Sequence, residues 1–244
     1  MKSSDRFALQ GLVPASLLSR DLKELSAYID SEGLCPVKIQ WKDGLLQNVN
    51  VIGKEAGQPL QIVLPRLVEP HAHLDKAFTW EKHPNLLGTY EGALQANFQE
   101  HRFRTASDVY VRAEKALRLS LKYGIRAIRT HIDSFGPIAD LSWEALKTLQ
   151  EEWKTLIDLQ LVALVPLEYW STDQGQLFGE RIAAKGGLFG AVIVPPFDID
   201  SCRKHLFQLV SLANRFNCEI DLHIDESQED PGLGLKQLIE VLEA

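Results

Sequence analysis

Apolar and polar stretches alternate along most of the chain in a pattern that predicts strands and helices in turn. Five short runs rich in Val, Ile and Leu are typical of strands covered on both faces: residues 67–73, 125–131, 159–165, 188–194 and 219–223. Strands that alternate with helices pair in parallel through right-handed crossovers. The pattern therefore predicts an α/β fold, and by itself it allows either a barrel or an open doubly wound sheet.

Amphipathic helical patterns come after these strands. The first has Thr105 or Ser107 as its N-cap and stops at Gly124, as a helix with a C-terminal glycine does. The other helices are expected to open at Ser142, to lie near 176–184, to run from Ser201 to about Phe216, and to begin after Pro231 and Gly232.

The first sixty or so residues have a different pattern. Residues 16–29 predict a helix, and residues 37–41 and 45–51 predict two strands around the hairpin turn Lys42-Asp43-Gly44. We therefore expect two domains: a helix and partial β-sandwich over 1–61, and a strand–helix domain over 62–244.

Ionisable side chains stand at the C-terminal ends of three predicted strands, as the pairs His71 and His73, His131 and Asp133, and His223 and Glu226. Residues two apart on a strand share a face, so His71 and His73 can reach one point, as ligands of one metal must. His223 and Glu226 are three apart and need the strand to end between them. This division suits a ligand followed by an acid or base.

Barrels of the (β/α)8 type place their chemistry on the face built from the strand C-termini. The three ionisable strand ends therefore favour a barrel over an open sheet. Only five βα units can be counted, so the expected fold is a TIM-type barrel that ends after about five units, with a small N-terminal β appendage.

Composition excludes several classes of protein. The net charge is -7 and the pI about 5.5, with no basic run that would neutralise nucleic-acid phosphates. Three cysteines without CxxC spacing indicate neither a disulfide framework nor a zinc knuckle. No signal peptide or membrane span is visible, so the expectation is a cytoplasmic protein that binds neither membranes nor nucleic acids.

Four stretches together resemble the amidohydrolase superfamily, in its cytosine deaminase-like group: LVEPHAHLD at 67–75, RTHID at 129–133, IDLQLVA at 157–163 and IDLHIDE at 220–226. An HxH pair alone is common by chance. HxHLD followed by RTHxD and HxDE, each at a strand end and in this order, is a specific combination.

The resemblance implies that His71, His73 and His223 bind one divalent metal, zinc or iron, and that Glu226 transfers protons. Three neutral imidazoles leave a position for water, whose pKa falls to about 7 on a catalytic zinc. Hydroxide would attack an amine-bearing ring carbon while Glu226 passes a proton to the ring and then to the leaving ammonia. The implied enzyme is a metal-dependent amidohydrolase that deaminates a small nitrogen heterocycle, such as a pyrimidine or a triazine.

Departures from the family pattern refine this expectation. Two-metal members bridge their ions with a lysine after strand four, where this chain has 192–196 (VIVPP), so one metal is favoured. After strand three, cytosine deaminases have a glutamine that reads the pyrimidine, where this chain has Val165–Trp170, and Tyr169 and Trp170 are candidates to stack on a ring.

The resemblance also places a histidine after strand six and an aspartate after strand eight, and neither has a counterpart before Ala244. A polypeptide limited to these residues is therefore expected to show negligible turnover. The alternative is an inactive fragment or pseudoenzyme, and the expected partner is a second copy of the chain or a complementing chain.

Several residues admit a simpler interpretation. His131 and Asp133 either contact substrate or orient the ligands. Asp75 and Lys76 are expected to form an exposed ion pair of little energetic weight. His83, His101 and His205 lack ligand spacing and are expected on the surface.

Overall fold

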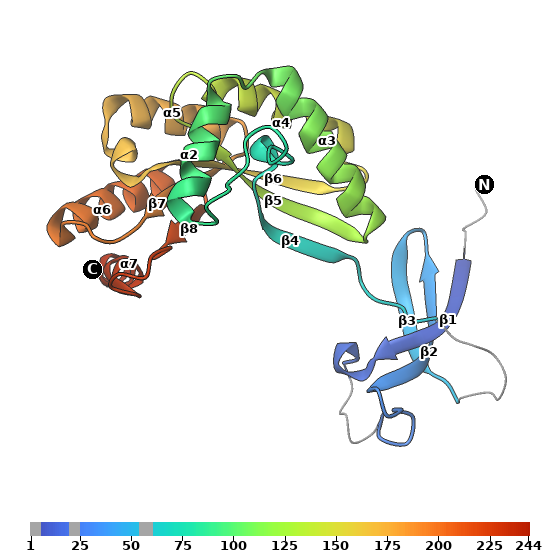
Figure 1. Ribbon diagram of the computed structural model, residues 1–244. Helices are drawn as coiled ribbons and strands as arrows, with labels where there is room; N and C mark the ends of the chain where they lie inside the picture. Colours follow the sequence, from blue (N-terminus) through green and yellow to red (C-terminus); the bar gives the residue numbers. More distant parts are fainter. Residues whose placement is uncertain (1–5, 20–24, 54–60) are drawn as a thin grey trace. The chain divides into compact units, whose positions relative to one another are not determined.

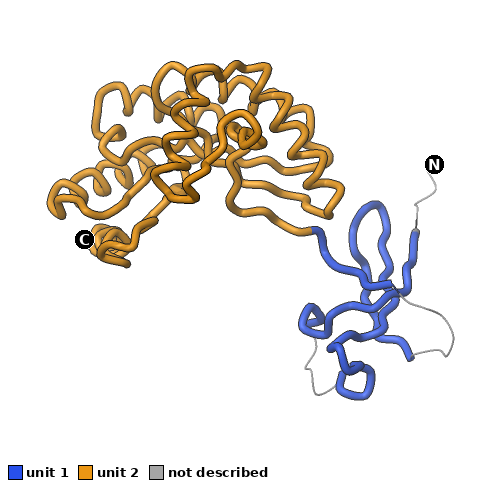
Figure 2. Tube along the Cα trace, in the orientation of Figure 1, with its two compact units in different colours: residues 1–66 blue, residues 67–244 orange. Residues whose placement is uncertain are grey.

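The computed structural model describes residues 6–19, 25–53 and 61–244. Its internal contacts divide the chain into two compact units, Met1–Arg66 and Leu67–Ala244, shown in two colours in Figure 2. The sequence placed the corresponding boundary after residue 61. Each unit is described by itself.

The first unit is a three-stranded antiparallel sheet in the order β1-β2-β3, formed by β1 (Arg6–Pro14), β2 (Leu34–Lys42) and β3 (Leu45–Val51). Asp43 and Gly44 have φ angles of 53° and 78°, which a two-residue hairpin turn of type I′ requires. The predicted hairpin is thus present.

The helix expected over 16–29 falls partly on residues 20–24, which lie outside the described residues. In the described part, a 3-10 turn, η1 (Ala15–Leu17), comes first, Leu25 is helical, and residues 26–28 form a turn. Strand β1 itself was not predicted. At Gly11 the segment after residue 60 packs so closely that an added Cβ would lie 2.4 Å from Val63 Cγ2, so glycine is required there.

The second unit contains a curled parallel sheet of five strands in the order β4-β5-β6-β7-β8 (Figure 1). The strands are β4 (Leu67–Ala72), β5 (Ile125–Asp133), β6 (Asp158–Pro166), β7 (Leu188–Ile193) and β8 (Ile220–Ile224). All five were predicted within two residues at either end. Neighbouring strands in the chain are neighbours in the sheet, the order that successive right-handed βα units produce.

Each strand is followed by one or two helices: α2 (Tyr90–His101), α3 (Ala106–Lys122), α4 (Ala139–Trp153), α5 (Asp173–Ala184), α6 (Ile199–Phe216) and α7 (Leu233–Glu243). The predicted caps are partly correct. Thr105 Oγ1 accepts a hydrogen bond from Asp108 N at the start of α3, whereas α6 is capped by Asp198, which accepts from Ser201 N. Short 3-10 turns, η2 (Leu74–Lys76) and η3 (Leu167–Ser171), come directly after β4 and β6.

Helix α2 was missed by the sequence analysis. Its residues Tyr90, Leu94 and Phe98 are 56%, 41% and 43% exposed, so its apolar side chains do not pack into the core. Such a helix lacks the core-facing stripe that makes a helix recognisable from sequence.

The core of this unit lies between the sheet and helices α3 to α6. Its largest fully buried side chains include Trp143 of α4, Trp170 of η3 and Phe189 of β7. The central strand β6 is buried along most of its length, whereas Leu67 and Val68 of the edge strand β4 are more than half exposed. An α/β architecture with strand C-termini gathered along one side is therefore established.

We predict that the α3–sheet contact stabilises this unit strongly. Leu117 is fully buried and Leu119, on the same helix, is 38% exposed. Leu117→Ala should lower the free energy of unfolding by about 2–5 kcal/mol, because it removes buried methyl groups and leaves a cavity. Leu119→Ala, with the same change in helix propensity, should cost less than about 1 kcal/mol. Urea denaturation measures both, and equal losses would contradict the packing described.

Candidate metal centre

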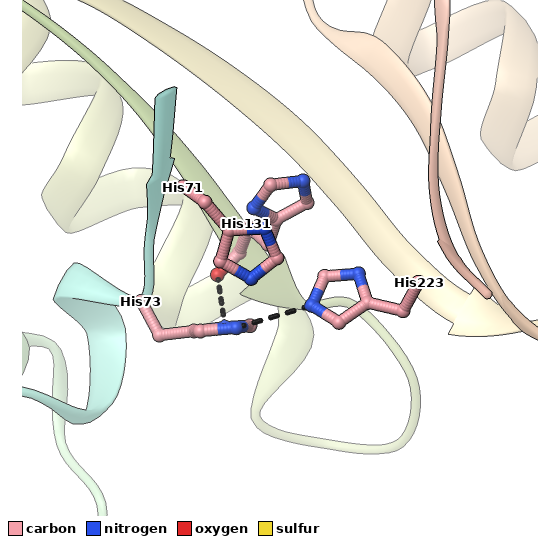
Figure 3. A group of neighbouring side chains, drawn as sticks. All are labelled: His71, His73, His131 and His223. Carbon is pink, nitrogen blue, oxygen red and sulfur yellow. Dashed lines mark hydrogen bonds between the residues drawn. The ribbon is translucent and has the colours of Figure 1, made fainter. Parts of the chain in front are cut away.

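Four histidine rings meet at the C-terminal side of the sheet. His71 lies in β4, His73 directly after it, His131 in β5 and His223 in β8, so segments 150 residues apart converge (Figure 3). One nitrogen from each ring lies within 4.8 Å of the others. His131 and His223 are buried, His73 is half-buried and His71 is exposed.

Hydrogen bonds fix the ring of His73. Its Nδ1 lies 3.2 Å from the backbone carbonyl oxygen of His131, which can only accept, so the neutral ring carries its proton on Nδ1. The lone pair is then on Nε2, which lies 3.2 Å from Nε2 of His223. Two ligand nitrogens of a tetrahedral zinc site lie roughly 3.3 Å apart, since Zn–N bonds are about 2.0–2.1 Å.

The electrostatic surroundings keep the rings of His73 and His223 neutral. Burial, helped by the charge of Lys76, lowers the pKa of His73 to about 3. Burial and the neighbouring His131 lower the pKa of His223 to about 4. Neutral imidazoles with free lone pairs are the form that binds a metal ion.

Two buried nitrogens of the cluster, Nδ1 of His131 and Nδ1 of His223, form no hydrogen bond of standard geometry. A cluster of imidazoles with converging nitrogens fits a divalent metal such as zinc or iron, for which imidazole is a suitable ligand.

His131 is held in place by Asp221, which in turn binds Arg129. Its Nε2 donates to Asp221 Oδ1 at 3.0 Å, and Arg129 Nη1 donates to Asp221 Oδ2 at 2.7 Å. Burial would raise the pKa of Asp221, but these two hydrogen bonds outweigh it and lower that pKa. The RTH motif and the aspartate two residues before His223 thus form one linked chain of contacts.

Glu226 lies two residues after the end of β8. Asp225 takes a left-handed φ of 57°, and its carboxylate accepts from the backbone N–H groups of Gly234 and Leu235 at the start of α7. This anchors the loop and leaves Glu226 beside a cavity that His73 and His223 also line.

The cavity has a volume of about 560 Å³ and a mostly apolar lining. Its walls come from helix α2, from the ends of β5, β6, β7 and β8, and from the segments directly after β4 and β8. The polar residues along it are His73, Lys76, Tyr90, Asn97, Asp133, His223 and Glu226. A concave apolar site with a few convergent polar groups is typical of small-molecule binding.

Comparison with known proteins decides the family. No family model matches the chain. A pterin deaminase of Rhizobium rhizogenes is 34% identical over 218 residues, 85% of this chain and 49% of that protein. An N-isopropylammelide isopropyl amidohydrolase of a Pseudomonas species is 25% identical over 171 residues, 68% of this chain and 42% of that protein.

A solved structure shares the fold of this chain. A crystal structure of 5-methylcytosine deaminase from Klebsiella pneumoniae matches with a TM-score of 0.73 at 23% identity, over 96% of this chain and 55% of that chain. The chain belongs to the amidohydrolase superfamily, in its cytosine deaminase-like group. It spans about half the length of the curated relatives it matches.

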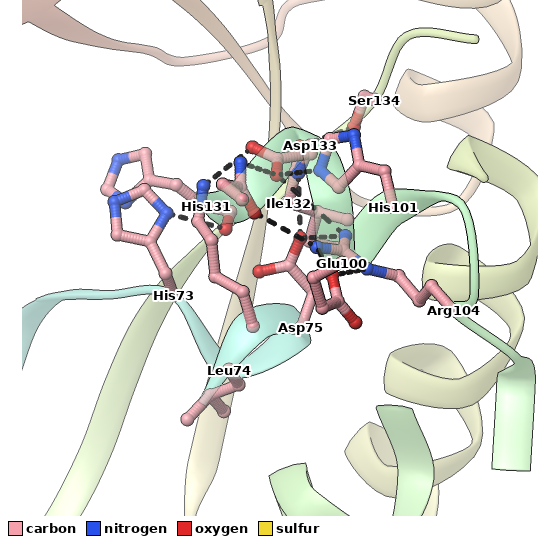
Figure 4. Close-up of polar contacts among 12 residues, drawn as sticks. His73, Leu74, Asp75, Glu100, His101, Arg104, His131, Ile132, Asp133 and Ser134 are labelled. Atoms are coloured by element: carbon pink, nitrogen blue, oxygen red, sulfur yellow. Dashed lines mark hydrogen bonds and ion pairs between the residues drawn. The ribbon is translucent and has the colours of Figure 1, made fainter. Parts of the chain in front are cut away.

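A buried ionic network lies beside the histidine cluster (Figure 4). Asp75 is completely buried, and its Oδ2 accepts from Arg104 Nη1 at 3.1 Å and from the backbone N of Asp133 at 3.0 Å. Arg104 also donates to Glu100, and Arg112 donates to the backbone carbonyl of Asp75. The expected exposed pair between Asp75 and Lys76 was wrong, because each has a different partner.

The partner of Lys76 is Asp133, whose Oδ1 lies 2.8 Å from the ammonium Nζ of Lys76. His101 and Asn97 of α2 also donate to Asp133, at 2.9 and 3.0 Å. Burial would raise the pKa of Asp133, but these hydrogen bonds and the charge of Lys76 hold it well below its usual range. His101 was expected on the surface, yet it is half-buried and bound to Asp133.

Two other candidates do not meet the cluster. Trp170 has no exposed surface, donates to the backbone carbonyl of Gly190 and stacks on Phe178. Tyr169 packs beside it, and neither residue lines the cavity of the histidines.

In the described part of the chain, no helix has the length and apolarity needed to cross a membrane.

The residues that sequence reasoning missed are Asn97, Glu100, His101 and Arg104. Asn97 and His101 bind Asp133, 36 and 32 residues away in the sequence, and Arg104 binds Asp75, 29 residues away. These separations are beyond the range of local sequence patterns. One signal was available: Glu100 and Arg104 are four residues apart, the spacing of helix ion pairs.

We predict that this network is a major source of stability. Arg104→Met leaves buried carboxylates without their cation and should cost about 3–5 kcal/mol of unfolding free energy. Arg118→Met is the matched control, since Arg118 pairs with Glu114 at the same spacing but is 66% exposed, and it should cost less than about 1 kcal/mol. Chemical denaturation would contradict the assignment if the two variants lost equal stability.

Proposed function

We propose that this chain carries the metal-binding half of an active site that hydrolytically deaminates a nitrogen heterocycle. The observation that carries the proposal is the convergence of His71, His73 and His223 beside a cavity that Glu226 also lines. The printed names of its relatives, a pterin deaminase and a 5-methylcytosine deaminase, support a ring substrate that bears an amino group.

One divalent ion, zinc or iron, is proposed to bind to His71, His73 and His223. When bound, such a metal supplies water that is acidic enough to react near neutral pH, with a pKa of about 7 on zinc. The single ion is favoured because Val192 and Val194 line the cavity at the end of β7, where a bridging lysine would be needed for two.

The chain's own residues would prepare the reaction. Glu226 would carry the first proton of the attacking water to a ring nitrogen, and then the proton of the added hydroxyl to the amino group, which leaves as ammonia. His131 orients His73 through its backbone carbonyl, at 3.2 Å. Asp133 stays ionised and fixes the ammonium of Lys76 at the cavity wall, where a ring oxygen or nitrogen can accept from it.

An alternative is an inactive or incomplete catalytic unit. The family resemblance adds a histidine after strand six and an aspartate after strand eight, and residues 1–244 contain no counterpart of either. The share of the relatives that the chain spans, about half, favours this alternative for a polypeptide limited to these residues. A complementing chain that contains them would then have to supply them.

The metal proposal predicts near-equimolar zinc after loading and gel filtration. A His71→Ala/His73→Ala double variant should lose it, because the imidazoles that remain do not complete a site. His83→Ala is the control, since His83 stacks on Phe103 outside the cluster. Elemental analysis gives the ratios, and equal zinc in the double variant and the unchanged chain would rule these ligands out.

The deamination proposal predicts zinc-dependent ammonia release from cytosine, a one-ring substrate, or pterin, a two-ring substrate. We expect it when the chain is co-expressed with the unmatched part of the pterin deaminase relative, and negligible release from the chain alone. Glu226→Gln should reduce the rate roughly 10²- to 10⁴-fold, as loss of a general acid–base group does.

Glu229→Gln is the matched control, an exposed glutamate in the same loop, and both variants should retain zinc. Full activity in Glu226→Gln would remove the proposed proton transfer. Absence of ammonia from every combination, with zinc bound, would favour the inactive alternative.

A further inference from the structure

Helix α2 has an apolar face that no part of the described core covers. Residues at positions i, i+3, i+4, i+7 and i+8 line the cavity, namely Tyr90, Ala93, Leu94, Asn97 and Phe98. This spacing defines one face of a helix. The side chains of Tyr90, Leu94 and Phe98 remain about half exposed.

The two ends of α2 differ in how they are held. At the C-terminal end, Asn97 and His101 donate to Asp133, and Glu100 binds Arg104. Nearer the N-terminus, the helix is capped by Thr89, which accepts from Gly92 N, and the cavity-facing residues Ala93 and Leu94 are apolar. The buried network therefore fixes the register of α2 and so determines which residues face the cavity.

The cavity consequently has a polar and an apolar end. Lys76, Asp133 and Asn97 form the polar end, which adjoins the histidines because Lys76 lies in η2 directly after His73, and His73, Lys76 and His223 line the same cavity. Phe98 follows Asn97 directly, Leu94 lies about one turn toward the N-terminus of α2, and the stripe from Tyr90 to Phe98 is about 12 Å long at 1.5 Å per residue.

We propose that the apolar face of α2 selects fused two-ring heterocycles over single rings. This inference rests on the proposed function and specifies its substrate class. A ring whose reacting carbon lies at His73 and His223 reaches the polar end with its own heteroatoms. A second ring fused to it extends along Phe98 and Leu94, and covers apolar surface that is otherwise exposed to water.

Charge at the site agrees with a neutral planar occupant. Asp133 is neutralised by Lys76 and by its hydrogen bonds with His101 and Asn97, and Arg104 lies 3.8 Å from it. In the described lining of the cavity, Glu226 is the carboxylate without such compensation, and we have assigned it the proton transfer. Aromatic and aliphatic contact is then the main source of discrimination.

The test is isothermal titration of the metal-free chain with pterin and with cytosine, since neither ring is consumed without metal. Leu94→Ala and Phe98→Ala should each weaken pterin binding by roughly 10-fold or more, the effect of losing one side chain that stacks on a base. Cytosine binding should change less than about 3-fold, because a single ring does not reach the apolar end.

Leu119→Ala and Phe103→Ala are the controls, because both residues are exposed and lie outside the cavity lining. Equal effects on the two rings, or none on pterin, would overturn the selectivity inference and leave the deaminase proposal standing. Failure of the unchanged chain to bind either ring would also overturn it. Zinc content and ammonia release decide the proposed function separately.

Discussion

The buried ion pair between Asp75 and Arg104 holds together the segments on which the site is built. Both side chains are fully buried, and Asp75 lies only two residues after His73. The same carboxylate accepts from the backbone of Asp133 at the end of β5. A charge removed from water is tolerated only when it is paired and hydrogen-bonded, so the turn after β4 cannot shift without a large free-energy cost.

The consequences of this pair reach both walls of the cavity. On one side, it fixes η2, so that His73 faces His223 and Lys76 reaches Asp133. On the other side, Glu100 connects Arg104 to α2, whose free apolar face then borders the cavity. The histidine cluster and the substrate wall are therefore positioned by one network, which explains why its residues are charged although they lie inside the protein.

The sheet and the histidines could be predicted because both depend on local patterns. Continuous apolar runs identify β5 to β8, and the period of two places His71 and His73 on one face. The partners of Asp75 could not be predicted, because a pairing across 29 residues leaves no local signal. Helix α2 was missed since its apolar stripe faces the cavity, and Trp170 was misjudged because its burial is not encoded in its position after β6.

The central claim is that the residues of this chain by themselves form a metal site at the strand ends. Anomalous diffraction from zinc-loaded crystals tests it most directly, because it locates the ion without any assumption about activity. The account predicts one strong peak within bonding distance of Nε2 of His73 and Nε2 of His223, with His71 beside it. Zinc bound elsewhere, with the four rings still in contact and no peak between them, would contradict it.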